Sequence, residues 1–382
     1  MIRIKDIKIR EDLLEEKVLE KALQKNRLQK EDVKKWYIYK KSIDARKKED
    51  IFYNYTIDIE LKDNNKEKIF EKIEEYKMPE IKVKRQSKIQ PVIIGAGPAG
   101  LFSALIFVEN GKKPILIERG KKVEDRVKDI EEFINNRKFN SKSNIQFGEG
   151  GAGTFSDGKL NTGNSSIYSR KVLEEFVKFG APKEIMYVAK PHLGTDNLVK
   201  IIKNIREYIL QQGGQMFFEE EVIDFEIEKG QIKSVITDQK RKIETDSVIL
   251  AIGHSARDTF KKLNELGVKI APKNFAVGVR IEHLQKDINM AQYGNKTKLK
   301  LGSADYKLVY HASNGRTCYT FCMCPGGKVM ASNSEENSIV TNGMSNFARD
   351  GENANSALLV NVSVEDFYKE SPLDGMYFQE EL

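Results

Sequence analysis

Hydrophobic and polar residues follow different periods along the chain, and the clearest pattern lies between residues 88 and 118. A short apolar run, Pro91 to Ile94, has the length and composition of a buried strand. A glycine-rich turn follows, and then apolar residues recur at i, i+3, i+4 and i+7, the spacing of one helix face. A second strand is predicted from Lys113 to Glu118. The apolar helix positions are Leu101, Ala104, Leu105 and Val108.

Residues 1–87 follow another pattern, which predicts a small α+β unit. Alternating apolar residues indicate strands, and apolar residues on one side of a 3.6-residue period indicate helices. The order βαββα, with a short strand at its end, is typical of a ferredoxin-like sandwich. A linker is expected at residues 82–90. The predicted strands are Ile2–Ile9, Trp36–Ile43, Phe52–Glu60 and Ile81–Val83, and the predicted helices are Leu13–Leu23 and the segment carrying Ile69, Phe70, Ile73 and Tyr76.

Beyond residue 190 the pattern alternates again between helix and strand. A stripe of apolar residues from Leu198 to Ile209 predicts a helix, and Thr195 or Asp196 could cap its N-terminus. Residues 256–349 contain short apolar runs separated by Gly, Asn and Pro turns, which predict a mostly antiparallel sheet. The strands expected between this helix and this sheet are Met216–Ile227, Ile232–Thr237 and Ser247–Ile252.

The glycine-rich turn after Ile94 has the pattern G-x-G-x-x-G and connects a strand to a helix. Its first glycine permits the tight turn, its second lets backbone amides approach a pyrophosphate, and its third lets the helix pack closely on the strand. The positive end of the helix dipole faces the phosphates in such sites. The motif residues are Gly95, Gly97, Pro98, Ala99 and Gly100.

An acidic residue and a second glycine-rich segment complete this pattern. Glu118 ends the second strand, 23 residues after Gly95, where an acid can accept hydrogen bonds from ribose hydroxyls. The segment 148–153 also fits G-x-G-x-x-G, but no apolar strand precedes it and no helix start follows. We expect a loop there, whose bare backbone approaches a flat or anionic group. A separate NAD(P)H domain with its own fingerprint is therefore not expected.

The run from Val92 to Arg119 resembles the FAD-binding opening of the two-dinucleotide-binding-domain flavoproteins, the glutathione-reductase-like superfamily. Further segments resemble one bacterial branch, described broadly as FAD-dependent dehydrogenases or oxidoreductases of unknown substrate. The resemblance spans nearly the whole chain. The segments are residues 41–46 (KSIDAR), 147–160 (FGEGGAGTFSDGKL), 191–196 (PHLGTD), 253–258 (GHSARD), 321–327 (FCMCPGG) and 342–351 (NGMSNFARDG).

This resemblance implies FAD as the cofactor and implies roles for the matching positions. The glycines of the first motif would hold the FAD pyrophosphate, and Glu118 would hold the adenosine ribose with Arg119 beside it. Val222 would offer its backbone to the adenine. Gly253 matches the glycine that ends the last strand before the chain leaves for the substrate domain. The glycines implied to line the flavin side are Gly150, Gly151 and Gly153.

The predicted fold class is α/β, a Rossmann-like FAD/NAD(P)-binding domain with an inserted, mostly antiparallel substrate domain and a small N-terminal α+β (ferredoxin-like) module. Family members carry a glycine-rich C-terminal segment over the flavin, whereas residues 352–382 hold one glycine, Gly375, so a truncation relative to the family is expected. The expected domains are 1–87 (module), 88–165 and 190–255 (FAD-binding), 166–189 and 256–350 (substrate or cap), and 351–382 (start of a C-terminal return segment).

The sequence assigns no catalytic residue, but three side chains are weak candidates. His192 could act as an acid–base group near the flavin, although a loop residue that positions the next helix cap is favoured. His254 and Arg257 follow a strand end expected near the cofactor. Arg257 could stabilise negative charge on a reduced flavin or hold an anionic substrate, or it could pair with Asp258 at a domain crossover.

Three cysteines, Cys318, Cys322 and Cys324, are too few for a disulfide framework and miss the spacing of zinc sites. No metal site is expected, and a reducing cytoplasm is the simplest location. On one strand face, Cys322 and Cys324 are expected to pack as small hydrophobes rather than to form a redox dithiol. The uncharged stretch 89–108 has the length of a membrane span, but glycines and a proline interrupt it, so no membrane segment is expected.

The net charge of the chain is +7, and residues 1–90 carry +6 of it. The basic residues there are interleaved with acids, which favours a solvated helix face over a nucleic-acid footprint. The sequence therefore predicts an FAD-dependent oxidoreductase, a dehydrogenase that transfers a hydride through flavin N5 to or from an unknown small-molecule substrate. Transient binding of NAD(P)H stays open. The alternatives are an RNA-associated flavoprotein that uses the basic N-terminal module and a non-catalytic, truncated flavoprotein fragment.

Overall fold

A parallel sheet of short strands organises the glycine-motif region in the computed structural model, which describes residues 1–63, 70, 72–82, 87–163 and 166–382. In this sheet β4 (Val92–Ile94) lies between β10 (Val248–Leu250) and β5 (Ile115–Ile117), and β6 (Gln215–Phe217) extends it beyond β5. The β4 and β5 residues are buried and are all Ile, Leu or Val, as is usual for parallel strands covered on both faces.

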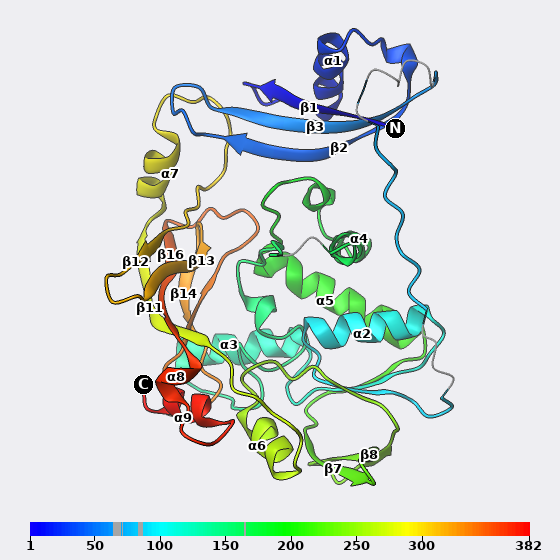
Figure 1. Ribbon diagram of the computed structural model, residues 1–382, viewed down its shortest axis with the longest axis vertical. Coiled ribbons are helices and arrows are strands. Elements are labelled where there is room, and N and C mark those ends of the chain that lie inside the picture. Colours follow the sequence, from blue (N-terminus) through cyan, green and yellow to red (C-terminus); the bar gives the residue numbers. More distant parts are fainter. Residues whose placement is uncertain (64–69, 71, 83–86, 164–165) are drawn as a thin grey trace.

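Helices cover one side of this sheet and a smaller sheet covers the other. α2 (Pro98–Glu109) begins directly after the glycine turn and lies beside α5 (Gly194–Gln211) (Figure 1). The apolar α2 positions expected from the sequence are all buried, in one cluster with α5 and the sheet. β7 (Val222–Glu228), β8 (Gln231–Thr237) and β9 (Lys242–Glu244) form an antiparallel sheet that packs on the opposite side.

The segment 166–189 packs differently from its expected place in the substrate domain. It contains α4 (Tyr168–Lys178) and a short 3-10 helix, Lys183–Met186. Phe176 belongs to the same buried cluster as α2 and α5, and its ring lies 5.5 Å from the ring of Phe102. The structure therefore corrects this assignment, because the apolar face of α4 is covered by the glycine-motif region.

Two local expectations in this region are also corrected. The strand expected at Met216–Ile227 is split into β6 and β7, because Glu219 has a left-handed φ of 55° that ends the extended run. At the start of α5 the N-cap residue is Leu193, not Thr195 or Asp196. Thr195 Oγ1 instead donates to the carbonyl of Thr154 (2.8 Å), and the Asp196 side chain accepts from the amide of Phe347 (2.8 Å).

The N-terminal module is an antiparallel sheet in the order β1-β3-β2, with α1 (Glu15–Lys25) packed on it (Figure 1). Its strands are β1 (Ile2–Ile9), β2 (Val33–Asp44) and β3 (Phe52–Leu61). The helix expected around Ile69 to Tyr76 is corrected where the structure describes it: residues 72–80 are not helical, and Lys72 forms a β-bridge to Ile2. Ile69 and Val83, which belong to that helix and to the expected last strand, lie outside the described residues.

The antiparallel sheet expected in residues 256–350 is present, in the order β11-β16-β13-β12 (Figure 1). Its strand β16 lies between β11 and β13, so the sheet extends past the boundary expected at residue 350. The strands are β11 (Phe275–Leu284), β12 (Val309–His311), β13 (Thr317–Cys324) and β16 (Asn353–Val362), with β14 (Lys328–Ala331) and β15 (Thr341–Met344) forming a separate pair.

Short helices connect and flank this sheet. α6 (Arg257–Glu265) follows β10, α7 (Gln285–Tyr293) follows β11, and α8 (Val364–Phe367) and α9 (Asp374–Glu380) follow β16. Among the helices of the described residues, none combines the length and the apolar character that crossing a membrane requires.

Candidate functional site

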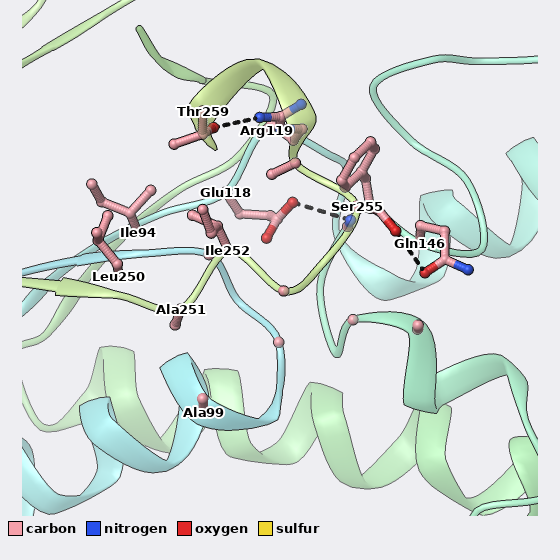
Figure 2. Close-up of a pocket in the computed structure, with 18 of the residues that line it drawn as sticks. Ile94, Ala99, Glu118, Arg119, Gln146, Leu250, Ala251, Ile252, Ser255 and Thr259 are labelled. Atoms are coloured by element: carbon pink, nitrogen blue, oxygen red, sulfur yellow. Dashed lines mark hydrogen bonds between the residues drawn. The ribbon is translucent and has the colours of Figure 1, made fainter. Parts of the chain in front are cut away.

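A cavity of about 410 Å³ opens at the carboxyl ends of β4, β5 and β10 (Figure 2). In open α/β sheets this edge is where ligands bind, and the volume lies within the usual range of small-molecule sites. The segments that line it include the glycine turn after β4, the second glycine-rich loop, the residues that follow β5 and β10, and the start of β7. The lining residues from these segments include Gly95, Gly97, Glu118, Gly151 and Gly253.

Within the first glycine motif the three glycines meet different constraints. Gly95 has a φ of 101°, and a Cβ there would lie 2.4 Å from the carbonyl oxygen of Ala251. A Cβ on Gly100 would lie 1.9 Å from the carbonyl oxygen of Gly95, so this glycine permits close packing and does not line the cavity. A Cβ on Gly97 would meet its nearest neighbour, the Cα of Gly151, at 3.9 Å, an ordinary contact. Gly97 therefore borders open space.

The second glycine-rich loop lies directly against the first motif. The amide of Gly150 donates to the carbonyl of Ala96 (2.8 Å), and a Cβ on Gly151 would lie 3.1 Å from the Cα of Gly97. Gly151 and Gly153 line the cavity. Gly150 lies behind them, since a Cβ there would point at Thr154 Oγ1, 2.1 Å away. The structure thus brings bare backbone from both glycine-rich segments to one cavity.

A buried arginine holds this loop in shape. Arg126, on α3 (Val123–Asn136), is 0% exposed, and its guanidinium donates hydrogen bonds to loop carbonyls. Burial lowers the pKa of Arg126 to about 10, opposed by the negative charges of Glu118 and Glu149, so the group stays charged near neutral pH. The acceptors are the carbonyl oxygens of Asn144 (2.7 Å), Ile145 (2.8 Å), Gly148 (3.4 Å), Glu149 (2.7 Å) and Gly151 (2.9 Å).

Glu118 is placed at the cavity, but its carboxylate also ties the two glycine-rich segments together. Oε2 accepts from the amide of Ala96 (2.7 Å), and Oε1 accepts from the amides of Gly120 (2.9 Å) and Gly148 (3.0 Å). Figure 2 shows the Glu118 side chain at the cavity. The residue is 5% exposed. An ionised carboxylate oxygen can accept two hydrogen bonds, so Oε2 keeps capacity for a further donor from the cavity.

Arg119 lies at the rim, between the cavity and α6. Its guanidinium forms a bidentate pair with Asp258 (3.0 Å for both bonds) and also contacts Glu221 (3.3 Å). It lies 4.6 Å from the ring centre of Phe147 and donates to Thr259 Oγ1 (3.2 Å) (Figure 2). Burial favours the neutral acid, but the hydrogen bonds from Arg119 outweigh it and hold the pKa of Asp258 below its usual range.

The weak catalytic candidates separate in space. His254 lines the cavity, as do the cofactor-binding candidates Val222 and Gly253. His192 does not: its Nε2 lies 2.8 Å from the carbonyl oxygen of Phe347 and its ring stacks on that residue, and burial lowers its pKa. Arg257 also points elsewhere, to Glu335 (3.3 Å), Gln379 (3.1 Å) and the carbonyl of Met376 (3.3 Å). The suggested pairing of Arg257 with Asp258 is wrong, because each has other partners.

Gln146 lines the cavity and was missed by the sequence reasoning, whereas Ser255 follows the strand end that was expected near the cofactor. Ser255 Oγ donates to Gln146 Oε1 (3.4 Å) across the cavity and also contacts His254 Nδ1 (3.0 Å) (Figure 2). Gln146 lies two residues before the second glycine-rich loop, and Ser255 lies two residues after the strand-ending Gly253. Position near a glycine-rich segment is the signal that could have identified Gln146.

Two family models match parts of the chain. Residues 274–382 match "FAD-dependent protein, C-terminal domain-like", and residues 1–60 match "Domain of unknown function (DUF8436)". A relative from Clostridium beijerinckii, "Uncharacterized protein", is 46% identical over 359 residues, which are 91% of this chain and 67% of the relative. The chain thus spans about two thirds of the length of this relative.

Solved structures also match, at low similarity. The L-amino acid deaminase from Proteus myxofaciens has 17% identity and a TM-score of 0.27, with 52% of each chain covered. The halogenase PltM has 10% identity and a TM-score of 0.37, with 78% of this chain and 56% of that chain covered. CtdE in complex with FAD has 16% identity and a TM-score of 0.32, with 75% and 62% covered. All three TM-scores are below 0.5.

The match over residues 274–382 agrees with FAD as the cofactor expected from the sequence, and that cofactor assignment is confirmed. On the identity of 46% across most of its length, the chain belongs to one family with the Clostridium beijerinckii protein.

Proposed function

We propose that this chain is an FAD-dependent oxidoreductase, a dehydrogenase of the glutathione-reductase-like superfamily, whose cavity holds the ADP half of FAD. In this proposal the parallel sheet and its helices form a Rossmann-like domain, and the antiparallel sheet is an inserted substrate domain. The observation that carries the proposal is the open space beside Gly97, between two glycine-rich segments at the N-terminus of α2.

The backbone around Gly97 fits a diphosphate. Gly97 is the N-cap residue of α2 and has no side chain, so it leaves the first-turn amides of the helix facing the cavity. These amides and the positive end of the helix dipole attract an anion. Pro98 occupies the first turn, where the lack of an N–H is harmless. Gly151 closes the opposite wall without adding a side chain.

The acid at the end of β5 fits a ribose. Glu118 lines the cavity, and its Oε2 can accept one hydrogen bond beyond that from Ala96. A ribose hydroxyl is the expected donor. Val222 lies at the rim of the same cavity, where its backbone is expected to meet the adenine.

When bound, FAD supplies a two-electron acceptor that takes up a hydride at flavin N5. On this chain, His254, Ser255 and Gln146 form the polar group that would face the remainder of the cofactor. The imidazole of His254 could hold or release a proton at the nitrogen that Ser255 does not contact. In this proposal the protein acts on a small-molecule substrate, and NAD(P)H binds only transiently.

A matched pair of Gly→Ala variants tests the binding site. Gly97→Ala adds a methyl group that the protein accommodates at 3.9 Å but that occupies the space assigned to the pyrophosphate. Gly163→Ala is the control, because its Cβ meets nothing within 4 Å and it lies outside the cavity. In a fluorescence titration with FAD, we expect Gly97→Ala to bind at least about tenfold more weakly, a loss of about 1.4 kcal/mol. Equal affinities of the two variants, with unchanged circular dichroism, would refute the assignment.

A further inference from the structure

Two cysteines at the end of β13 have their sulfur atoms close together. In a regular strand, residues i and i+2 share a face and are separated by about 6.6 Å along the strand. The register of β13 against β16 shifts between Phe321 and Cys324, and Cys322 takes a left-handed φ of 45°. The Sγ atoms of Cys322 and Cys324 are 4.0 Å apart. Strand β13, which carries both residues, is labelled in Figure 1.

The backbone at Cys322 is an uncommon conformation for a residue that has a Cβ. Such conformations carry an energetic penalty and persist where the surrounding structure enforces them. Gly343, on β15, leaves room for this arrangement because it has no side chain. A Cβ at this position would lie 2.6 Å from Cys324 Sγ and 2.5 Å from Arg280 Nη1. Arg280 and the two thiols therefore lie close together beside the irregular part of β13.

The two thiols have different surroundings. Cys322 is half-buried, whereas Cys324 is fully buried and its Sγ lies 3.2 Å from the carbonyl oxygen of Cys322. The contact with Cys324 lowers the pKa of Cys322, and the positive charges of Lys159 and Arg280 act in the same direction, against burial and the negative charge of Asp157. The same contact and burial raise the pKa of Cys324.

An accessible thiol with a lowered pKa beside a buried thiol is the arrangement of an attacking and a resolving cysteine. Packing as small hydrophobes, the role expected from the sequence, explains neither the left-handed Cys322 nor the nearby cations. We propose that Cys322 and Cys324 are a redox-active dithiol that reacts with low-molecular-weight disulfides and closes to an intramolecular disulfide.

The proposed reaction is a thiol–disulfide exchange in two steps. The Cys322 thiolate attacks one sulfur of a small disulfide RSSR, which forms a mixed disulfide and releases RS⁻. Cys324 then loses its proton to solvent and attacks the Cys322 sulfur, which forms the intramolecular bond and releases the second RS⁻. Both thiolates take up protons, so the dithiol gives two electrons to RSSR, which becomes two RSH. Closing the Sγ–Sγ distance from 4.0 Å to the bonded length of about 2.05 Å requires a movement of about 2 Å.

A redox titration of the purified chain tests the proposal. The protein is equilibrated in buffers with defined ratios of reduced to oxidised glutathione, quenched in acid, alkylated, and read by intact-mass and peptide mass spectrometry. Cys318→Ser provides the control, because Cys318 lies on the same strand and is half-buried but outside the pair. We expect wild type and Cys318→Ser to lose two alkylatable thiols together, in one two-electron transition, with a peptide mass lower by two hydrogens.

Two further variants separate an intramolecular disulfide from separate oxidation of each thiol. Cys324→Ser removes the resolving thiol, so Cys322 should accumulate as a mixed disulfide with glutathione. Cys322→Ser removes the attacking thiol, so the buried Cys324 should stay alkylatable after unfolding at every ratio. The proposal is overturned if Cys322 and Cys324 of wild type stay reduced at every ratio, or if they gain glutathione independently. Wild type alone decides between these outcomes, even if a variant fails to fold. None of these readouts depends on FAD.

Discussion

Replacing Arg126 tests how the second glycine-rich loop is held against the cofactor cavity. Arg126→Met removes a fully buried guanidinium that donates to loop carbonyls at distances of 2.7 to 2.9 Å in four bonds and 3.4 Å in a fifth. A buried carbonyl that loses its donor costs about 1–3 kcal/mol. At about 1 kcal/mol for each of the four shorter bonds, the variant should lose about 4 kcal/mol of unfolding free energy.

Arg126→Lys gives an intermediate result by the same reasoning. An ammonium has three donors and no planar fork, so it satisfies at most three of the carbonyls. The loss expected is at least about 1 kcal/mol and less than that of Arg126→Met. Lys128→Met is the matched control on the same helix, because its ion pair with Asp125 is exposed and contributes little to stability.

Urea-induced unfolding followed by circular dichroism measures these changes, and an FAD titration measures their effect on the site. Because the loop carries Gly151, both Arg126 variants should also weaken FAD binding, while Lys128→Met should not. The reasoning is refuted if Arg126→Met stays within about 1 kcal/mol of wild type and binds FAD equally well.

Three further predictions follow from the same region. Glu118→Gln replaces one carboxylate oxygen by an NH2 group that faces backbone amides, so it should lower the free energy of unfolding in urea by about 1–3 kcal/mol and weaken FAD binding. An unchanged urea midpoint would contradict this role. Gly100→Ala should lower the thermal midpoint more than Gly97→Ala, because its Cβ meets a backbone oxygen at 1.9 Å; the reverse order would show that the motif packs differently. Burial raises the pKa of Glu149 in the folded protein to about 7, although the ion pair with Arg206 acts in the opposite direction. As the pH rises from about 4.5 to about 7, the unfolded chain therefore loses this proton before the folded protein does, and the contribution of Glu149 to stability falls. Glu149→Gln should flatten that slope in unfolding measured at pH 5, 6 and 7, and parallel curves for the two proteins would argue against it.

The glycine-motif region could be predicted from the sequence because each of its residues is constrained locally. The apolar spacing of α2, the buried runs of β4 and β5, and the glycine positions depend on contacts within about thirty residues. The steric roles expected of Gly95 and Gly100 correspond to the close contacts that a Cβ would make there. The second glycine-rich loop was also expected to approach a ligand, and it lines the same cavity.

Features that depend on distant partners could not be predicted. Glu118 was expected to face a ribose, but three backbone amides, two of them outside its own strand and turn, compete for its carboxylate. Arg126 was not singled out from the sequence, and only the folded loop shows that it is buried. Likewise, residues 166–189 were assigned to the substrate domain, whereas Phe176 packs with residues of α2 and α5 that lie far from it in sequence.

The closeness of Cys322 and Cys324 has the same origin. Their C-x-C spacing indicates a shared strand face, which is compatible with simple packing. The bulge that brings their sulfurs together arises from the register of β13 against β16, and the cations come from Lys159 and Arg280, far away in sequence.

The most direct test of the central claim is to identify the nucleotide that the purified chain binds. The protein is saturated with FAD, desalted, examined by absorbance spectroscopy, and denatured so that the released ligand can be weighed by mass spectrometry. A flavin spectrum, with FAD released in about one equivalent from wild type and much less from Gly97→Ala, is the predicted result. A colourless protein that retains no FAD, or one that retains as much after Gly97→Ala, would contradict the account.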